Sequence, residues 1–238
     1  LDGWGAPYSA TPDIYGSSKM FSYGGIKVYG SGHVICNNAV AFFFQGISIC
    51  RYGRPEEKQE AVAIDIINND IHLIVDDFIE ADGGVHNIRV IQNRCVNAAE
   101  NGLSAHPVFG GPVYFVRNVL YNVPAGSAVK VNSEPAGLFV LHNTFITENN
   151  FPKTFSNAHF RNNLLLGSDS PGCILAAFPL ATIYSTYDYN GYRPNLKTDN
   201  NYTWVSPPSG QTQNYFTDAS KNGKSFNSLK SLSDASGL

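Results

Sequence analysis

The side chains best suited to chemistry in this chain recur at equivalent places in short segments of alternating polarity. The segments are GISIC (46–50), FIEAD (78–82), GLSAH (102–106) and AVKVN (128–132). Their alignment superposes the apolar residues Ile79, Leu103 and Val129, which should face a core because alternate residues of a strand share one face. The residues between them then form two columns that point outward. One column reads Ser48, Glu80, Ser104, Lys130, and the other reads Cys50, Asp82, His106, Asn132.

A third position, just before each segment, aligns Gln45, Asp77, Asn101 and Ser127. Neighbouring coils lie about 4.8 Å apart, and alternate residues along a strand lie about 6.6 Å apart. We therefore expect one patch that extends over three coils. It consists of Asp77, Glu80, Asp82, Ser104, His106, Lys130 and Asn132. In a chain with only 15% charged residues, this concentration of ionisable groups makes the patch the candidate site.

One chemistry that such a patch would support is elimination at a uronate polymer. The reaction removes the proton alpha to a carboxyl group, so it needs a base and a means of neutralising that carboxyl. Lys130 would be the base, which requires a lowered pKa, and His106 would neutralise charge or act as the base instead. Calcium favours clustered oxygen ligands. The residues that would hold a calcium ion are Asp76, Asp77, Glu80 and Asp82.

A second chemistry is glycoside hydrolysis. It needs two carboxyl groups beside the scissile bond, about 5–5.5 Å apart for retention of configuration and about 6.5–9.5 Å apart for inversion. Glu80 and Asp82 have backbone positions roughly 6.6 Å apart along one strand, so this pair would serve.

The patch would also suit a glycan-binding surface without catalysis. The rings that would stack on a sugar are Tyr114, His86, Phe109 and Tyr121. A purely structural interpretation stays open as well. In it, Asp77 caps a turn, and Glu80 pairs with Lys130 across the sheet.

The elements that must hold this patch are strands of a repeating structure. Six asparagines each have an apolar residue three positions before them and another two positions after them. They are Asn38, Asn69, Asn93, Asn118, Asn143 and Asn163, at intervals of 31, 24, 25, 25 and 20 residues. Strand repeats of this length are typical of solenoids. Asparagine tolerates the left-handed backbone of a sharp bend, and its amide can bond to the asparagines of adjacent coils, so we interpret the six as a structural ladder.

These repeats resemble the coils of secreted bacterial β-helix proteins of the pectate-lyase-like superfamily. The resemblance covers about residues 25–195 and is carried by NIRVIQN (87–93), VYFVRN (113–118), LFVLHN (138–143), DDFIEADGG (76–84), GPVYFVRNVLYN (111–122) and STYDYNGYR (185–193). It implies a right-handed parallel β-helix. The superfamily includes polysaccharide lyases, glycoside hydrolases, epimerases and non-catalytic adhesins, so the resemblance alone does not specify an activity. Asp76 and Asp77 are similar to the adjacent aspartates of polygalacturonases, but the GHG and RIK elements of that family are absent.

Composition excludes several partners. The net charge is −3 and no run of lysine or arginine offers a phosphate-binding surface, so we expect no nucleic-acid partner. No segment reaches the roughly 18 apolar residues of a membrane span, and no charged and apolar leader is visible. The four cysteines lack metal-like spacing. Cys95 falls on a core position, whereas pairing of Cys36 with Cys50 stays open.

We therefore predict an all-β, single-domain right-handed parallel β-helix with an irregular C-terminal cap. Residues 1–24 form an irregular edge, 25–166 the coils, and 167–238 an irregular final coil and the cap. The charged stretch 51–60 is predicted to be a loop between coils, and a short terminal helix is expected around Leu229 and Leu232.

The predicted function is cleavage of an acidic or plant-type polysaccharide by a secreted or periplasmic protein, as a lyase or a glycoside hydrolase. Calcium is the candidate cofactor, and the polysaccharide is the only partner expected. The alternative is a non-catalytic glycan-binding or adhesive β-helix. A third possibility is that the catalytic machinery lies in portions of a longer chain.

Overall fold

The structure is a computed structural model. It describes residues 23–49, 60–106, 108–124, 126–131, 136–147, 156–167, 176–179, 186–193, 202–205 and 223–236. The predicted loop at 51–60 lies outside these residues apart from Glu60, as do Cys50, Cys173 and Asn132.

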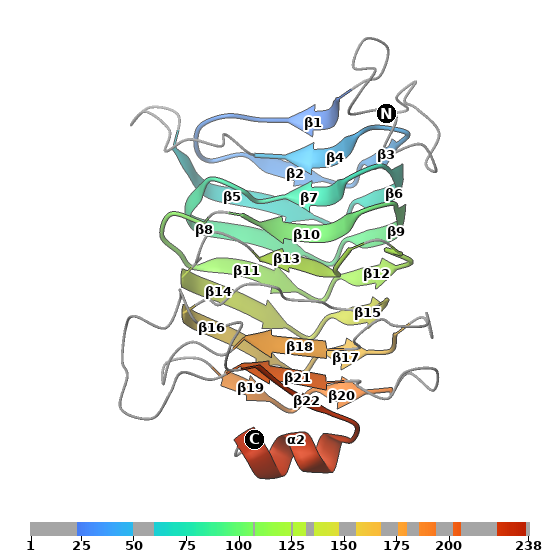
Figure 1. The fold of residues 1–238 in the computed structure, drawn as a ribbon. Helices are drawn as coiled ribbons and strands as arrows, with labels where there is room; N and C mark the ends of the chain where they lie inside the picture. The colour runs from blue at the N-terminus through green and yellow to red at the C-terminus, as the bar shows by residue number, and fades with distance from the viewer. Residues whose placement is uncertain are drawn as a thin grey trace.

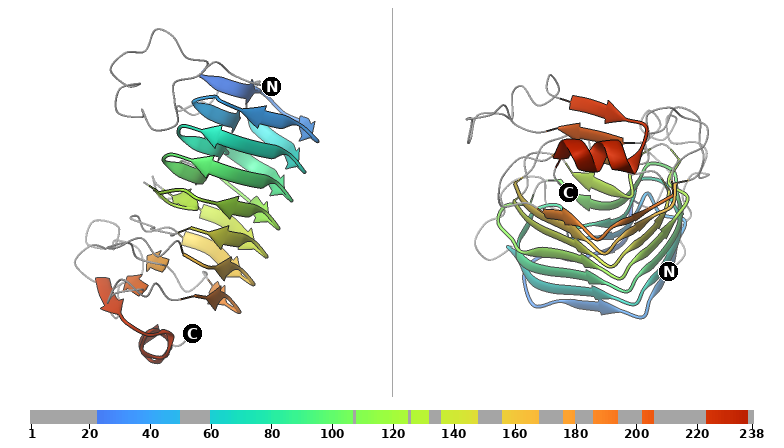
Figure 2. Two further views of the ribbon diagram at one scale, coloured as in Figure 1. Left: turned by 90° about the vertical axis from the view of Figure 1, so that its right-hand side faces the viewer. Right: turned by 90° about the horizontal axis from the view of Figure 1, so that it is seen from below.

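The chain winds into a parallel β-helix of the right-handed type, which confirms the predicted all-β fold (Figures 1 and 2). Each complete coil contributes one strand to each of three parallel sheets. Sheet I contains β1 (Gly24–Lys27), β4 (Gln45–Ser48), β7 (Asp77–Glu80), β10 (Asn101–Ala105) and β13 (Val129–Val131). Sheet II contains β2 (Val34–Cys36), β5 (Ala61–Ile67), β8 (Gly84–Ile91), β11 (Val113–Val116), β14 (Ala136–Leu141), β16 (Ser156–Arg161) and β19 (Thr186–Asp188). Sheet III contains β3 (Ala39–Ala41), β6 (Asp70–Ile74), β9 (Arg94–Ala98), β12 (Val119–Tyr121), β15 (Thr144–Ile146), β17 (Leu164–Leu165) and β20 (Gly191–Tyr192).

The apolar residues that flank the asparagines form the core of the helix. In sheet III, Ile71 pairs in register with Cys95, and Cys95 with Leu120. In sheet II, Val90 pairs with Phe115. All five side chains are 0% exposed, so the sequence template correctly identified which face of each strand is buried. The prediction that Cys95 is a buried thiol is confirmed, and Cys36 is an exposed free thiol.

The asparagine ladder is present and extends one coil beyond the predicted set. At each step, the backbone nitrogen and Nδ2 of one asparagine lie 2.9–3.0 Å from Oδ1 of the next. The seventh rung is Asn190, flanked by Tyr187 and Tyr192. Its flanking residues are tyrosines, so a template that requires purely apolar neighbours does not find it.

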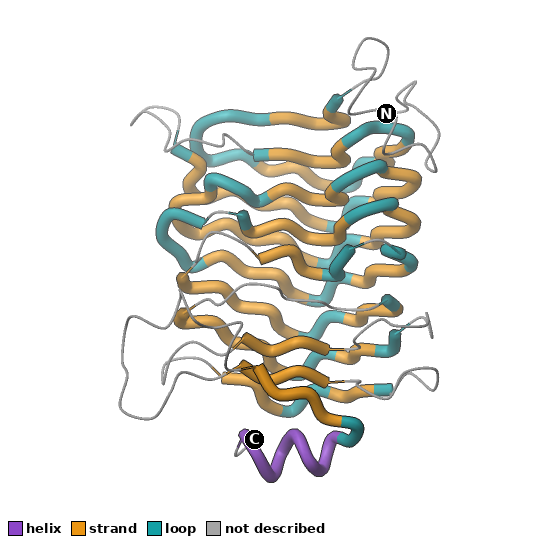
Figure 3. The backbone as a smooth tube through the Cα atoms, in the orientation of Figure 1, coloured by secondary structure: helices purple, strands orange, loops and turns teal. Residues whose placement is uncertain are grey.

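The ladder asparagines are not the left-handed residues of the bend, contrary to our prediction. The positive φ angles of 54–58° belong to the residue that precedes each rung. These residues are Asn37, Asn68, Gln92, Arg117, His142, Asn162 and Tyr189. The preceding residue makes the turn, and the ladder residue can then direct its amide along the helix axis. The path of the backbone through these bends is traced in Figure 3.

The C-terminal region packs at one end of the helix (Figures 1 and 2). Strands β18 (Ala176–Pro179), β21 (Tyr202–Val205) and β22 (Gly223–Phe226) form a separate small sheet, in which β21 and β22 are antiparallel. Helix α2 (Leu229–Ser236) follows, as expected from the spacing of Leu229 and Leu232. Among the described residues, no helix is long and apolar enough to cross a membrane.

The ladder predicts a sharp difference between a central rung and its neighbour. In Asn118→Ala, the two Asn93 donors lose their shared acceptor and the Val90 carbonyl loses its donor. Each unsatisfied buried group costs about 1–3 kcal/mol, so the free energy of unfolding should fall by about 3 kcal/mol or more. Urea denaturation monitored by circular dichroism measures this. The matched control is Val119→Thr at a side chain that is 41% exposed, which should change stability by no more than about 0.5 kcal/mol. Equal effects of the two substitutions would contradict the ladder account.

Candidate active site

The register of sheet I brings together the residues that the alignment predicted. Glu80 pairs with Ser48 on one side and with Ser104 on the other, and Ser104 pairs with Lys130. Asp77 pairs with Asn101. The predicted column of Ser48, Glu80, Ser104 and Lys130 is therefore present on β4, β7, β10 and β13, whereas the second column includes Cys50 and Asn132, which lie outside the described residues.

Strand β7 is held in place from inside the helix by a large side chain between two small ones. Phe78 is 0% exposed and lies in register between Gly46 and Gly102. A Cβ atom on Gly46 would come within 2.4 Å of the Phe78 carbonyl oxygen, and one on Gly102 within 2.1 Å of the Ala128 carbonyl oxygen. The two glycines thus allow a close approach of neighbouring coils. Phe78 anchors the strand that carries the acidic residues.

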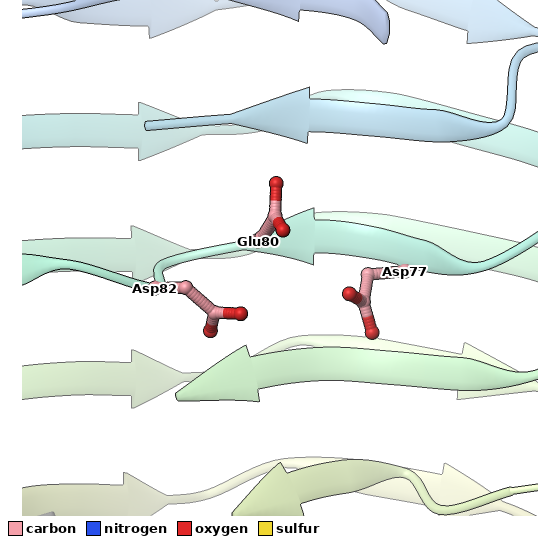
Figure 4. A group of neighbouring side chains, drawn as sticks. All are labelled: Asp77, Glu80 and Asp82. Atoms are coloured by element: carbon pink, nitrogen blue, oxygen red, sulfur yellow. The ribbon is translucent and has the colours of Figure 1, made fainter. Parts of the chain in front are cut away.

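Three carboxylates of this strand and its end meet in one cluster, shown in Figure 4. One oxygen each from Asp77, Glu80 and Asp82 lie within 4.8 Å of one another. We call these three residues the carboxylate cluster. Their exposed fractions are 0%, 1% and 1%, so the cluster is buried rather than part of the open outer surface that strand alternation suggests. Alternation identifies the side of the sheet on which a residue lies, but it does not show what covers that side.

Glu80 is hydrogen-bonded by the preceding coil. Gln45 Nε2 donates to Glu80 Oε1 at 2.9 Å, and Ser48 Oγ donates to Glu80 Oε2 at 2.5 Å. The two donors occupy both oxygens of this carboxylate and fix its orientation. The sequence alignment included Gln45 without assigning it a role. In the structure, its Oε1 atom is buried without a hydrogen-bond partner.

Asp82 is held by the following coil and has one oxygen left over. Ser104 Oγ and the backbone nitrogen of His106 each donate to Asp82 Oδ1 at 2.6 Å. Asp82 Oδ2 is buried without a hydrogen-bond partner. Burial, and then the negative charge of Glu80, raise the pKa of Asp82 to about 7. An acid with this pKa exchanges its proton near neutral pH, which suits acid and base catalysis.

Asp77 forms an ion pair with Lys130 two strands away. Lys130 Nζ lies 3.2 Å from Asp77 Oδ2, and the lysine side chain is 21% exposed. Burial and the neighbouring carboxylate of Asp76 raise the pKa of Asp77 well above its usual range. Burial alone would lower the pKa of Lys130, but Asp77, Asp76 and Asp82 together raise it above its ordinary value. Lys130 therefore stays protonated, which corrects the prediction that it acts as a base with a lowered pKa.

The remaining predicted residues have different placements. Asp76 is buried and accepts a hydrogen bond of 3.0 Å from Asn101 Nδ2, which fits a supporting role beside the cluster. His106 is half-buried at the end of β10, where its backbone contacts Asp82. Asn132 lies outside the described residues.

Tyr114 and His86, predicted to contact substrate, lie on sheet II, whereas the carboxylate cluster lies on sheet I. The Tyr114 ring stacks on Phe139 with centroids 5.2 Å apart, and Phe139 stacks on His159 at 4.7 Å. The rings therefore stack face to face along the helix axis. This arrangement covers ring faces that a sugar would need.

Among the described residues, one lysine balances part of the charge of the cluster. Four buried acids lie beside it, namely Asp76, Asp77, Glu80 and Asp82, and buried charges require a partner or a proton. Protons supply one solution, as the raised pKa values indicate. A hard cation supplies another, because the three clustered carboxylates and the unpaired oxygens of Asp82 and Gln45 are the donor type that calcium prefers.

The fold and the site thus define a parallel β-solenoid with a buried carboxylate cluster on its five-stranded sheet. No protein-family model matches the chain, and searches of curated proteins and of solved structures found no match.

The Asp82 environment predicts a stability that falls as pH rises. A carboxyl whose folded pKa is raised binds its proton more tightly in the folded state, so its stabilisation is complete below about pH 4 and is lost as pH rises through about 7. Without divalent cations, the free energy of unfolding should decrease over this window by on the order of a few kcal/mol. Asp82→Asn should make the profile less steep and leave the contribution of Asp77, whose pKa is also raised, whereas Asp70→Asn, at a half-exposed surface pair with Arg94, should leave the slope unchanged. Denaturation midpoints at pH 4, 5.5, 7 and 8.5 test this. A wild-type profile as flat as that of Asp82→Asn would contradict the assigned environment.

Proposed function

We propose that this protein is a carbohydrate-active β-helix enzyme that cleaves an acidic polysaccharide at the carboxylate cluster. The resemblance of its coils to the pectate-lyase-like superfamily supports a polysaccharide substrate. Polymers of this kind occur outside the cytoplasm, so the proposal includes a secreted or periplasmic location.

The observation that carries the proposal is the contrast between two carboxyl groups held close together. Both oxygens of Glu80 accept hydrogen bonds, from Gln45 and Ser48, whereas Asp82 has one buried oxygen without a partner and a pKa of about 7. Glycosidases divide the roles of nucleophile and acid between carboxyl groups whose environments differ in this way. Clustered oxygens within 4.8 Å leave less room for a water between them than the about 6.5–9.5 Å of inverting enzymes. Hydrolysis with retention of configuration is therefore the reaction that we propose.

In the first step, the Glu80 carboxylate attacks the anomeric carbon, the bond from that carbon to the glycosidic oxygen breaks, and Asp82 gives its proton to the departing oxygen. In the second step, Asp82 takes a proton from water, and the resulting hydroxide displaces Glu80 from the anomeric carbon. The protonated Lys130 ammonium would bind the carboxylate of a uronate residue. Each proton is returned, so the cycle balances without a further reactant.

The half-buried residues around the cluster indicate the direction of substrate entry. Asn101, His106 and Lys130 are partly exposed, and all three belong to the β10 and β13 side of the cluster. Gln45 and Ser48, on the β4 side, are 0% exposed. We therefore propose that the polymer approaches the cluster across β10 and β13.

A second candidate function is calcium-dependent elimination, and the unpaired oxygens of Asp82 and Gln45 favour it. In this reaction Asp76, Asp77, Glu80 and Asp82 would hold the ion, which would neutralise the uronate carboxylate. His106 would be the base, since Lys130 is protonated. A non-catalytic glycan-binding protein is the remaining alternative.

The test is incubation of the protein with pectic, alginate and other uronate polymers, with calcium or with a chelator. Hydrolysis predicts new reducing ends without absorbance near 235 nm. Elimination predicts new reducing ends together with that absorbance, and only when calcium is present. Hydrolytic activity should fall as pH rises above about 7, because Asp82 must carry its proton. Glu80→Gln and Asp82→Asn should each lower kcat by about 100-fold or more.

Asp70→Asn is the matched control and should retain full activity, because this half-exposed aspartate lies on sheet III. Absence of both products from every polymer, with glycan binding retained, would overturn the enzymatic proposal in favour of the binding protein. Equal losses in Glu80→Gln, Asp82→Asn and Asp70→Asn would show that the effects are structural.

A further inference from the structure

A pocket lies at the C-terminal end of the helix, far along the chain from the carboxylate cluster. A half-open cavity of about 170 Å³ lies between the last coil, which carries β19 and β20, and helix α2. Figure 2 shows α2 beside that end of the coils. We call it the end pocket. The residues that matter here are Asp188, Tyr189, Asn190 and Tyr192 from the coil, with Leu229 and Ser233 from the helix.

Within the described residues, the last rung of the asparagine ladder lies at this pocket with one donor still to be satisfied. Every earlier rung directs its backbone N–H and its Nδ2 toward one oxygen of the next rung, as in the step from Asn163 to Asn190. Asn190 Nδ2 donates to the Phe160 carbonyl and contacts Tyr192. Within the described residues, the backbone N–H of Asn190 has no acceptor. The ladder geometry thus defines a place for one acceptor oxygen at the position that an eighth rung would occupy.

The walls around this position combine a ring face with polar groups. Tyr189 is 71% exposed, and Arg161 covers one face of its ring at 5.4 Å. The Asp188 side chain is 50% exposed and offers acceptor oxygens, while Ser233 offers a hydroxyl. Tyrosine rings present a negative face that attracts polarised C–H groups. A cavity of about 150 Å³ accommodates one six-membered ring, so a volume of about 170 Å³ suits a single ring.

We propose that the end pocket binds one neutral pyranose ring of a glycan. A ring hydroxyl would accept from the Asn190 N–H, another would donate to Asp188, and the C–H face of the ring would lie on Tyr189. Neutrality follows from charge, because Asp188 is the one acidic or basic side chain among the described residues that line the pocket, and Arg161, outside the lining, lies 3.7 Å from it. A uronate carboxylate would meet Asp188 without a free cation there. This site goes beyond the proposed function, since it binds sugar without cleaving it.

The test is saturation-transfer NMR and calorimetry on the full chain with methyl galactopyranoside, methyl glucopyranoside and methyl galacturonide. A neutral glycoside should receive saturation transfer and bind measurably, while the uronide should bind at least about tenfold more weakly. Tyr189→Ala should weaken binding of the neutral glycoside about fivefold or more. The matched control is Tyr29→Ala, at a tyrosine 55% exposed near the opposite end, which should bind as the wild type does.

A second variant tests the pocket by filling it. Leu229 is 45% exposed at the pocket wall, so Leu229→Trp should abolish binding without disturbing the buried core. Glu80→Gln should leave binding at the end pocket unchanged, which separates this site from the proposed catalytic one. Failure of both neutral glycosides to bind the wild type, or an equal loss in Tyr29→Ala and Tyr189→Ala, would overturn the proposal.

Discussion

The coil-to-coil register is the constraint on which the rest of this structure depends. Parallel strands repeat along the axis, so each side chain has a fixed neighbour in the coils before and after it. The asparagine ladder fixes that register at one corner through paired hydrogen bonds of 2.9–3.0 Å. A slip by one residue would exchange the inner and outer faces of a strand, which would expose the core and bury the ladder incorrectly.

The carboxylate cluster is a direct product of this register. Glu80 accepts hydrogen bonds from side chains of β4. Asp82 accepts hydrogen bonds from Ser104 of β10 and from the backbone nitrogen of His106, which follows that strand. Asp77 forms an ion pair with Lys130 of β13. Four coils are therefore needed to assemble one site, although all three acids lie within the six residues 77–82. The ladder keeps these coils aligned, so the structural asparagines position the chemistry without contacting it.

The sequence predicted the fold because its signal repeats. Six copies of one template identified the buried flanks, and the alignment of four strand segments identified the column of Ser48, Glu80, Ser104 and Lys130 on sheet I. The repeat could not distinguish sheets that both carry alternating residues, which explains why Tyr114 and His86 were assigned to the site although they lie on sheet II. It also missed Asn190, whose flanking tyrosines combine apolar rings with polar ends.

Two features of the site depend on three-dimensional distance and charge, which the pattern does not encode. The pKa of Lys130 is raised rather than lowered because its ammonium lies 3.2 Å from Asp77, a partner 53 residues away in the chain. Burial of the cluster is a feature that alternation does not report. Because its pKa is raised, Lys130 serves as a cation and not as a base. This leaves Asp82 as the group that exchanges a proton.

The most direct measurement of this central claim is a carbon-13 NMR titration of the aspartate and glutamate side-chain carboxyls without divalent cations. Our account predicts one aspartate resonance, absent from Asp82→Asn, that titrates near pH 7. Its pKa should fall in Glu80→Gln, because the neighbouring negative charge is removed. A spectrum in which every carboxyl titrates between about pH 3 and 5, with no change in Glu80→Gln, would contradict the account.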